Sequence, residues 1–329
     1  MPANHFTFKP LILAAIQKNG GWVNAHAHVD RAFTINPDSL GMYSNHTLEE
    51  KWDLVDAVKK DASETEYYDR FCRAFEVMIS NGVNAIGSFV DVDPVCKDRA
   101  IKGGLRAREK FKNELSIRFA TQTLKGVINK EARYWFDRGA ELVDIIGGLP
   151  KRDERDFGPG FGAKHMDILL QTAKRQNKLV HVHVDQFNTP MDVETELLCN
   201  KTVEHGMQNK VVAIHAISLA AHKKSYRLKI YKKLKAAGIM MIACPMAWID
   251  SPRREDVAPI HNSLTPVDEL VSAGITVAIG TDNICDFMVP FCDGDMWQEL
   301  SVLAAGTRFT NIDELVKIAT INGRKVLGL

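Results

Sequence analysis

Two histidines stand two residues apart in the segment GWVNAHAHVD, residues 21–30, where an apolar run gives way to polar residues. The run is typical of a β-strand, and side chains in a strand alternate between its two faces. His26 and His28 are therefore expected to point to the same side, as two ligands of one metal ion must. Hydrogen bonds to neighbouring groups would explain the same pair, so the spacing alone leaves both interpretations open.

Three further polar residues stand at the ends of similar apolar runs. His183 lies near the end of KLVHVHVD, His215 near the end of KVVAIHA, and Asp282 at the end of ITVAIGTD. Imidazole and carboxylate groups are ligands that suit Zn²⁺ or Fe²⁺. Burying so many ionisable groups without a cation would cost free energy. Where these ends meet, the sequence predicts one divalent metal ion, zinc or iron.

The elements that would position these residues recur along the chain. Short apolar runs alternate with stretches of helical period, which indicates repeated β–α units. Eight strands are expected, at residues 21–28, 83–92, 116–123, 141–148, 178–185, 210–216, 238–245 and 275–282. Eight such units predict an α/β fold, the (β/α)8 TIM barrel, whose active sites lie at the carboxyl ends of the strands.

Several helices carry start signals. Thr47 and Ser63 open capping boxes, and Thr265 is expected to cap a helix whose first residue is Pro266. Leu48, Trp52 and Val55 repeat at helical spacing and are expected in the core. His181 is expected as a hydrogen-bonded residue inside the barrel. The segment 32–46, which contains a proline and a glycine, follows the first strand and is a candidate lid.

Composition narrows the class of protein. The chain has 329 residues, of which 45% are hydrophobic and 25% charged, and a formal net charge of +1. This balance gives no basic surface for nucleic acid, and no apolar run reaches the 18 residues of a membrane span. The six cysteines show no paired framework, which favours free thiols. We expect one domain over residues 1–329, a small-molecule partner, no membrane or nucleic-acid partner, and a cytoplasmic location.

The strand-end residues resemble those of the amidohydrolase superfamily, in its cytosine deaminase-like branch. The resemblance is carried by HAH after the first strand, HVD on the fifth, IHA on the sixth and GTDN on the eighth. It extends from about residue 22 to residue 329. It implies a mononuclear centre with His215 beside the bound water. The metal ligands that it implies are His26, His28, His183 and Asp282.

The resemblance also bears on the number of metal ions. A two-metal centre in this superfamily needs a bridging carboxylate, usually a modified lysine, at the end of the fourth strand. The stretch LVDIIGGLP offers no lysine there, which favours one ion, although Asp144 keeps the alternative open. A bound cation would lower the pKa of its water and so provide a nucleophile near neutral pH. Asp282 is then expected to accept the water proton and His215 to polarise the developing charge.

The leaving nitrogen must also gain a proton, and here the sequence departs from the family. Cytosine deaminases carry a glutamate three residues after the histidine of the fifth strand, whereas HVDQ places Gln186 there. A carboxamide orients a substrate but does not exchange a proton near neutral pH. The leading interpretation is that His215 and Asp282 handle both transfers. The others are help from Asp185, a leaving group that needs less protonation, or a slow or inactive enzyme.

Three residues match positions that face the substrate in the family. Gln122 ends the third strand, where cytosine deaminases present an amide to the ring edge. Arg31 stands where many relatives carry lysine, and is expected to meet a ring carbonyl or carboxylate. Asn283 stands where cytosine deaminase has a second aspartate, which puts cytosine in doubt as the substrate. For each residue a structural role in its loop is an equal alternative.

Amidohydrolases of this branch usually carry a small β-sandwich beside the barrel. Few residues precede the first strand, so we expect that this barrel lacks the sandwich or that the chain is a shortened product of a longer gene. Barrel surface that the sandwich covers would then be exposed. This predicts a homo-oligomer.

Three functions follow as hypotheses. The first is a metal-dependent hydrolase that removes an amine or ammonia from a nitrogen heterocycle such as a pyrimidine, pterin or triazine. The second is hydrolysis of a cyclic amide or of a substituted ring amine, with Gln186 marking the altered leaving group. The third is a catalytically silent barrel used for binding or assembly. Gln186 and the missing sandwich favour the third hypothesis, and the complete ligand set argues against it.

Overall fold

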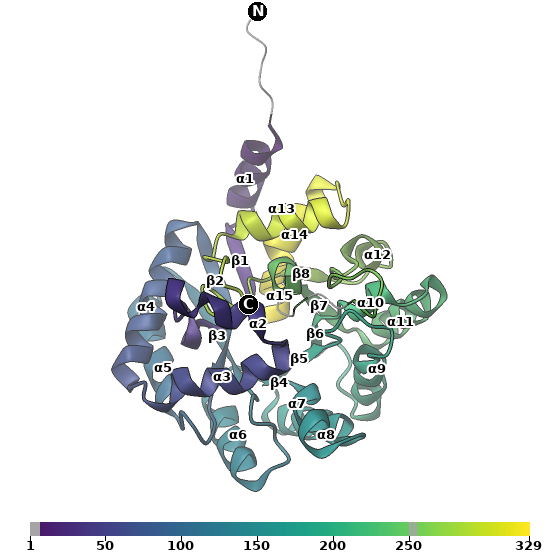
Figure 1. Ribbon diagram of the computed structural model, residues 1–329. Helices are drawn as coiled ribbons and strands as arrows, with labels where there is room; N and C mark the ends of the chain where they lie inside the picture. The colour runs from purple at the N-terminus through teal and green to yellow at the C-terminus, as the bar shows by residue number, and fades with distance from the viewer. Residues whose placement is uncertain (1–6, 250–251, 253–254) are drawn as a thin grey trace, which may run out of the picture.

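The computed structural model describes residues 7–249, 252 and 255–329. Its eight strands are parallel and follow one another around a single sheet in chain order, with helices outside (Figure 1). The strands are β1 (Trp22–Ala27), β2 (Val83–Asp91), β3 (Ser116–Gln122), β4 (Ile145–Gly148), β5 (Leu179–Val184), β6 (Val211–His215), β7 (Met240–Ala243) and β8 (Val277–Ile279). The predicted (β/α)8 barrel is confirmed.

Helices fill every connection between consecutive strands. The α-helices are α1 (Phe8–Lys18), α2 (Leu40–Asn45), α3 (Leu48–Lys60), α4 (Glu64–Ser80), α5 (Arg99–Phe111), α6 (Lys130–Leu142), α7 (Pro150–Phe157), α8 (Phe161–Gln176), α9 (Glu194–Glu204), α10 (Ser218–Ala221), α11 (Lys224–Ala237), α12 (Val267–Ser272), α13 (Met296–Gly306), α14 (Ile312–Ala319) and α15 (Ile321–Leu327). Short 3-10 turns are η1 (Val29–Arg31), η2 (Pro37–Ser39) and η3 (Pro245–Ile249). Among the described helices, none has the length and apolar character that a bilayer crossing requires.

Two sequence expectations about element boundaries are wrong. The fourth strand begins at Ile145 rather than at 141, because α6 continues through Leu142 and takes the first part of the apolar run. Thr265 does not cap α12, which begins at Val267 without a side-chain cap. Its hydroxyl instead donates to the carbonyl oxygen of His215 at 2.6 Å, so the hydroxyl fixes the end of β6.

The capping boxes at Thr47 and Ser63 are confirmed. The hydroxyl oxygen of Thr47 accepts the backbone N–H of Glu50, whose carboxylate accepts the N–H of Thr47 at 2.7 Å. Ser63 and Glu66 form the same pair at the start of α4. These boxes satisfy N–H groups that have no partner inside their helices, and so fix where α3 and α4 begin.

The barrel closes between β8 and β1, at the residues singled out in the sequence. The N–H of Asp282 donates to the carbonyl of His26 at 3.0 Å, and the N–H of His28 donates to the carbonyl of Asp282 at 3.0 Å. Gly280 permits this approach, because a Cβ there would lie 2.6 Å from the carbonyl oxygen of His26. The closing hydrogen bonds therefore hold both histidines beside Asp282.

The opposite end of the barrel is filled by the C-terminal helix. Val326 and Leu327 of α15 are buried with residues of the barrel interior such as Phe89. The ring of His181 lies 2.8 Å from the carbonyl oxygen of Val326 through its Nε2. The prediction that His181 is a hydrogen-bonded interior residue is confirmed. A small molecule would therefore enter the interior from the rim formed by the carboxyl ends of the strands.

Candidate active site

Five side chains singled out in the sequence meet at the carboxyl-end rim. His26 lies on β1 and His28 directly after it, while the other three lie on β5, at the end of β6 and after β8. All five are buried, with at most 4% of each residue exposed; they are His26, His28, His183, His215 and Asp282. Residues more than 250 positions apart in the chain are thus in contact.

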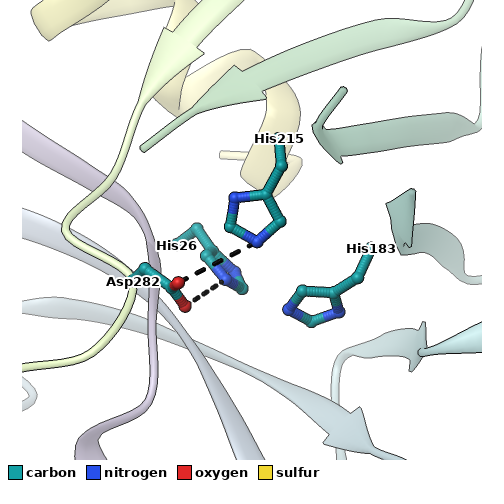
Figure 2. Close-up of side chains that lie close together, drawn as sticks. All are labelled: His26, His183, His215 and Asp282. Carbon is teal, nitrogen blue, oxygen red and sulfur yellow. Dashed lines mark hydrogen bonds and ion pairs between the residues drawn. The ribbon is translucent and has the colours of Figure 1, made fainter. Parts of the chain in front are cut away.

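The distances are those of groups that share one small space. Oδ1 of Asp282 lies 3.1 Å from Nε2 of His26 and 3.0 Å from Nε2 of His28. Nε2 of His215 lies 3.9 Å from Oδ2 of Asp282. Figure 2 shows the imidazoles of His26, His183 and His215 directed towards the space beside this carboxylate. Ligands about 2.0–2.2 Å from a common ion are themselves about 3 Å apart, so these contacts have metal-site spacing.

The geometry identifies a ligand group slightly different from the expected one. One donor atom from each of His26, His183, His215 and Asp282 lies within 4.8 Å of the others. The resemblance implied His28 in place of His215. His28 is nevertheless in contact with Asp282, so the space has five candidate ligands rather than four.

The protonation states suit a cation. Burial lowers the pKa of His28 and His183, and lowers that of His215 to about 4, so these imidazoles are neutral near pH 7. Burial acts to raise the pKa of Asp282, but hydrogen bonds with His26 and His28 lower it well below its usual value. Neutral imidazoles and an ionised carboxylate are the forms that bind metal ions.

Unpartnered nitrogen atoms provide a separate test of fit. Nδ1 of His26, Nε2 of His183 and Nε2 of His215 are buried and have no hydrogen-bond partner among the described residues. An unsatisfied buried polar atom is costly, and such atoms usually have a ligand, an ion or water. The Nδ1 of His183 lies 3.1 Å from the carbonyl oxygen of Gly148, which leaves its Nε2 directed to the site. The residues therefore fit one divalent ion.

The backbone adopts the left-handed region at three of these strand ends. His215 has φ +70°, and the residue after it, Ala216, has φ +52°. Asp282 has φ +61° and Asp185, two residues after His183, has φ +51°. L-residues other than asparagine and aspartate rarely adopt this left-handed region, and such conformations are found most often at functional sites.

The three predicted substrate-facing residues and Gln186 also lie here. A narrow cavity of about 20 Å³ beside His28, His183 and Asp282 is lined in part by polar side chains from four different loops and strands. These are Arg31, Gln122, Gln186 and Asn283. The cavity has room for about one water molecule.

The polar groups in this cavity have defined directions. Oε1 of Gln122 accepts the N–H of Thr123 at 2.8 Å, and its Nε2 lies 3.5 Å from Nδ1 of His28, so the amide N–H₂ is turned to the site. Nδ2 of Asn283 donates to the carboxylate of Asp286, which leaves the Oδ1 of Asn283 as an acceptor. For Gln186 no side-chain hydrogen bond is found within the described part of the chain.

Arg31 belongs to a buried charge network that the sequence did not reveal. Its guanidinium lies 3.6 Å from Asp286 and 3.9 Å from Asp91, and Lys59 lies 3.5 Å from Asp91. Burial raises the pKa of Asp91 to about 7 and that of Asp286 to about 6. Asp91 ends β2, and its place at a strand end was the only signal available in the sequence. Near neutral pH these carboxyls are partly protonated, so they balance the positive charge of Arg31 only in part.

Apolar side chains form the remaining wall. Leu124 and Leu149 follow β3 and β4, Met288 follows β8, and Leu48 and Trp52 come from α3. The sequence expectation placed Leu48 and Trp52 in the core. Both are indeed buried, but they line the cavity as well.

Asp144 does not lie where a carboxylate could bridge two metal ions at the candidate site. It precedes β4 and accepts from the guanidinium of Arg108 at 2.9 Å and from the N–H of Phe119 at 2.9 Å. The candidate metal ligands lie at the opposite, carboxyl end of the strands. Asp144 instead lines a pocket with Lys178 at the amino ends of β4 and β5. The alternative of a second metal ion held by this residue is wrong.

The comparison with known proteins decides the family. Residues 20–329 match the model of the amidohydrolase family. The chain belongs to this family. The resemblance found from the strand-end residues is thereby confirmed, and a hydrolase that acts on carbon–nitrogen bonds is supported.

Similarities to individual proteins are consistent with membership of this family. The chain is 58% identical over 265 residues to an uncharacterized protein of Haemophilus influenzae, which covers 80% of this chain and 95% of the relative. It is 25% identical over 316 residues to N-isopropylammelide isopropyl amidohydrolase of Pseudomonas sp. strain ADP, covering 94% of this chain and 74% of the relative. A structure of 5-methylcytosine deaminase from Klebsiella pneumoniae has a TM-score of 0.84 at 24% identity, covering 94% of this chain and 75% of that one. That likeness shows the same fold.

Proposed function

We propose that this amidohydrolase is metal-dependent and removes an amine or ammonia from a small nitrogen heterocycle of the pyrimidine, pterin or triazine type. The observation that carries the proposal is the group of three buried imidazoles and one carboxylate whose donor atoms lie within 4.8 Å of one another. Two of these imidazoles direct unpartnered Nε2 atoms to the shared space. The complete set argues for an enzyme over a silent barrel.

We assign metal binding and proton transfer to particular side chains of the site. His26, His28, His183 and Asp282 would hold one Zn²⁺ or Fe²⁺. When bound, the ion supplies activation of a water molecule for attack at neutral pH. His215, neutral because burial lowers its pKa to about 4, is placed to donate a hydrogen bond to the oxygen that develops negative charge at the attacked carbon. Asp282 is placed to receive the proton of the water and, with His215, to pass it to the leaving nitrogen.

The polar wall supports a flat ring that carries hydrogen-bonding groups at its edge. Gln122 presents an N–H₂ donor and Asn283 an oxygen acceptor, and Arg31 adds further donors. Because Asp91 and Asp286 lie beside Arg31 and balance part of its charge, we favour a ring carbonyl over a carboxylate as its partner. The apolar side chains opposite suit the faces of such a ring.

A substituted ring amine is a second candidate substrate. Gln186 has no hydrogen bond to another described residue and takes the position of the family's proton-donating glutamate. A leaving group that needs less protonation would make that glutamate dispensable. A relative that matches 94% of the chain bears the name N-isopropylammelide isopropyl amidohydrolase, and this name of an N-substituted compound supports the candidate.

The deciding experiment combines metal analysis with a substrate panel. Protein purified and loaded with Zn²⁺ or Fe²⁺ is expected to hold about one ion per chain and to release ammonia or an alkylamine from at least one aminopyrimidine, aminopterin or aminotriazine. His183→Asn is the control and should lose both the ion and the release. A fully loaded protein that releases no amine across the panel would contradict the proposal and favour the silent barrel.

Assembly and location remain part of the proposal. Large apolar side chains are exposed on several outer helices, among them Phe8 and Leu11 of α1. We propose a homo-oligomer, and one domain over residues 1–329, in the cytoplasm. Light scattering at micromolar concentration is expected to give a mass above one chain, and a monomer would contradict the assembly.

A further inference from the structure

Helix α3 closes the cavity over the candidate metal site. Leu48 and Trp52 of this helix line the same cavity as His28 and His183. In Figure 1, α3 and α2 lie in front of the strands, across part of the barrel mouth. The cavity volume of about 20 Å³ admits a water molecule but not a six-membered ring. A wall of the cavity must therefore move before a heterocycle enters.

The walls formed by the loops after β3, β4 and β8 are anchored by buried hydrogen bonds. The N–H of Leu149 donates to the hydroxyl of Thr123 at 2.8 Å and lies 3.2 Å from Nε2 of His165. The N–H of Met288 donates to the carboxylate of Asp286 at 2.8 Å. Moving these walls would leave buried polar groups without partners, which is costly.

The C-terminal end of α3 is also firmly held. The buried ammonium of Lys59 pairs with Asp93 and lies 3.5 Å from Asp91. The guanidinium of Arg99 donates to the carbonyl oxygens of Lys59 at 3.2 Å and Lys60 at 3.0 Å. Separating a buried ion pair leaves uncompensated charge, so this end is suited to act as a hinge.

The part of α3 that carries Trp52 is held differently. Asp53 lies 3.2 Å from the guanidinium of Arg152 and 3.4 Å from that of Arg155, both on α7. Arg155 also donates to the carbonyl of Glu49 at 2.9 Å and covers the ring of Trp52. The Asp53 side chain is 57% exposed, whereas those of Arg152 and Arg155 are 9% and 23% exposed, so water can solvate the carboxylate when it separates from the arginines. Ion pairs of a solvent-exposed carboxylate contribute modest stability and are screened by salt.

We propose that α3 is a gate over the active site. It turns about its Lys59 end, and the ion pairs of Asp53 with Arg152 and Arg155 form the latch that keeps it closed. Opening admits the ring, and closing places Leu48 and Trp52 against it and excludes bulk water from the reaction. The role of the gate in admitting substrate depends on the proposed function, whereas the contacts that define the gate do not.

The test compares Asp53→Asn with wild type and with a matched control, Glu76→Gln. Glu76 forms an exposed ion pair with Lys110 at 3.1 Å between α4 and α5. Hydrogen exchange of peptides that cover residues 48–56 is measured by mass spectrometry. In Asp53→Asn these amides are expected to exchange about 3–10-fold faster, while peptides from β1 and β5 and all peptides of Glu76→Gln match wild type.

A second readout uses the metal site. The rate at which EDTA removes Zn²⁺ from loaded protein is expected to rise about 3–10-fold in Asp53→Asn and to be unchanged in Glu76→Gln. Sodium chloride should accelerate removal from wild type by screening the latch, and have little effect on Asp53→Asn.

The outcomes separate the two proposals. Unchanged exchange in residues 48–56 of Asp53→Asn overturns the gate, and so does exchange that rises equally across the whole chain, since that reports lower global stability. If wild type fails to retain Zn²⁺, the proposed metal-dependent function fails, and the exchange of α3 still decides for or against the gate.

Discussion

The candidate active site holds ionisable residues whose charges are set by burial and by hydrogen bonds. Three imidazoles are kept neutral by desolvation, while Asp282 stays ionised because His26 and His28 hydrogen-bond to it. Gln186 contributes no charge to this site. Where the resemblance to cytosine deaminases implies a glutamate, this chain therefore has a residue that can orient a substrate but cannot carry a proton.

Gln186→Glu tests where the leaving nitrogen obtains its proton. If His215 and Asp282 handle both transfers, the variant should change kcat by less than about tenfold and leave the metal content unaltered. Steady-state rates with the best substrate of the panel provide the measurement. A wild type without activity and an active Gln186→Glu variant would show instead that the glutamate is indispensable and that the natural chain is silent.

Glu299, a residue with no role in the proposed reaction, predicts a pH-dependent stability. Its side chain is fully buried and accepts the N–H of Met246 at 3.0 Å, and burial raises its pKa to about 8. Below about pH 8 the folded chain keeps this proton, whereas the unfolded chain loses it near the usual value of 4.5. The folded state thus binds more protons in this range, so stability falls as pH rises from about 4.5 to about 8.

Glu299→Gln should remove this fall in stability with rising pH. Relative to wild type, the variant is expected to gain up to about 1.4 kcal/mol of unfolding free energy per pH unit across that range, because one fewer proton is exchanged on unfolding. Urea denaturation at about pH 5 and about pH 8 measures the difference. Glu76→Gln, on the surface of α4, is the control, and parallel pH profiles for Glu299→Gln and wild type would refute the assignment.

Among the elements, the contact between β8 and β1 decides whether the site forms. Gly280 lies against the backbone of His26, with room for no Cβ: the nearest atoms would be 2.6–2.8 Å away. The same contact carries the hydrogen bonds that fix Asp282 between His26 and His28. The element that closes the barrel is thus also the one that assembles the ligands.

Gly280→Ala should therefore damage both stability and metal binding. Because backbone atoms cannot yield as side chains do, we expect a loss of about 1–3 kcal/mol in unfolding free energy and a reduced metal content. Denaturation and metal analysis provide the two measurements. Gly41→Ala in α2, whose nearest neighbour would be 3.9 Å away, is the control and should lose neither. Normal metal content in a stable Gly280→Ala protein would contradict this role of the contact.

For the whole molecule, we expect the proposed metal binding to be linked to folding. The proposed ligands come from β1, from the residue after it, from β5 and from the segment after β8, and they meet only in the folded barrel, so the ion should bind the folded state in preference to the unfolded chain. With free metal at about 1,000 times its dissociation constant, the ion adds about 4 kcal/mol, which for a chain of this length raises Tm by about 5 °C.

Thermal denaturation with and without EDTA measures this effect. Wild type loaded with metal is expected to lose about 5 °C on chelation, by the same linkage argument. Asp282→Asn should show no response to the chelator, since it lacks the ionised ligand. Equal Tm values for loaded and chelated wild type would indicate that no ion is held at the strand ends.

The sequence by itself determined which residues the site contains. Strand periodicity and strand ends are local features, so the positions of His26, His28, His183, His215 and Asp282 at one rim of a barrel followed from the pattern of apolar runs. The resemblance to the amidohydrolase superfamily, rather than periodicity, led us to expect Gln122, Gln186 and Asn283 beside them. Which side chains at the strand ends point to the same side could be predicted because side-chain direction in a strand alternates with a fixed period.

Only the tertiary structure decided how those residues are used. It removed Asp144 from the site, placed His215 within the ligand group, surrounded Arg31 with Asp91 and Asp286, and laid α3 across the cavity. These facts depend on which segments approach one another when β8 meets β1, and no spacing within a single element encodes them. Contacts between residues distant in the chain arise from closure of the barrel, and closure is a property of all eight strands together.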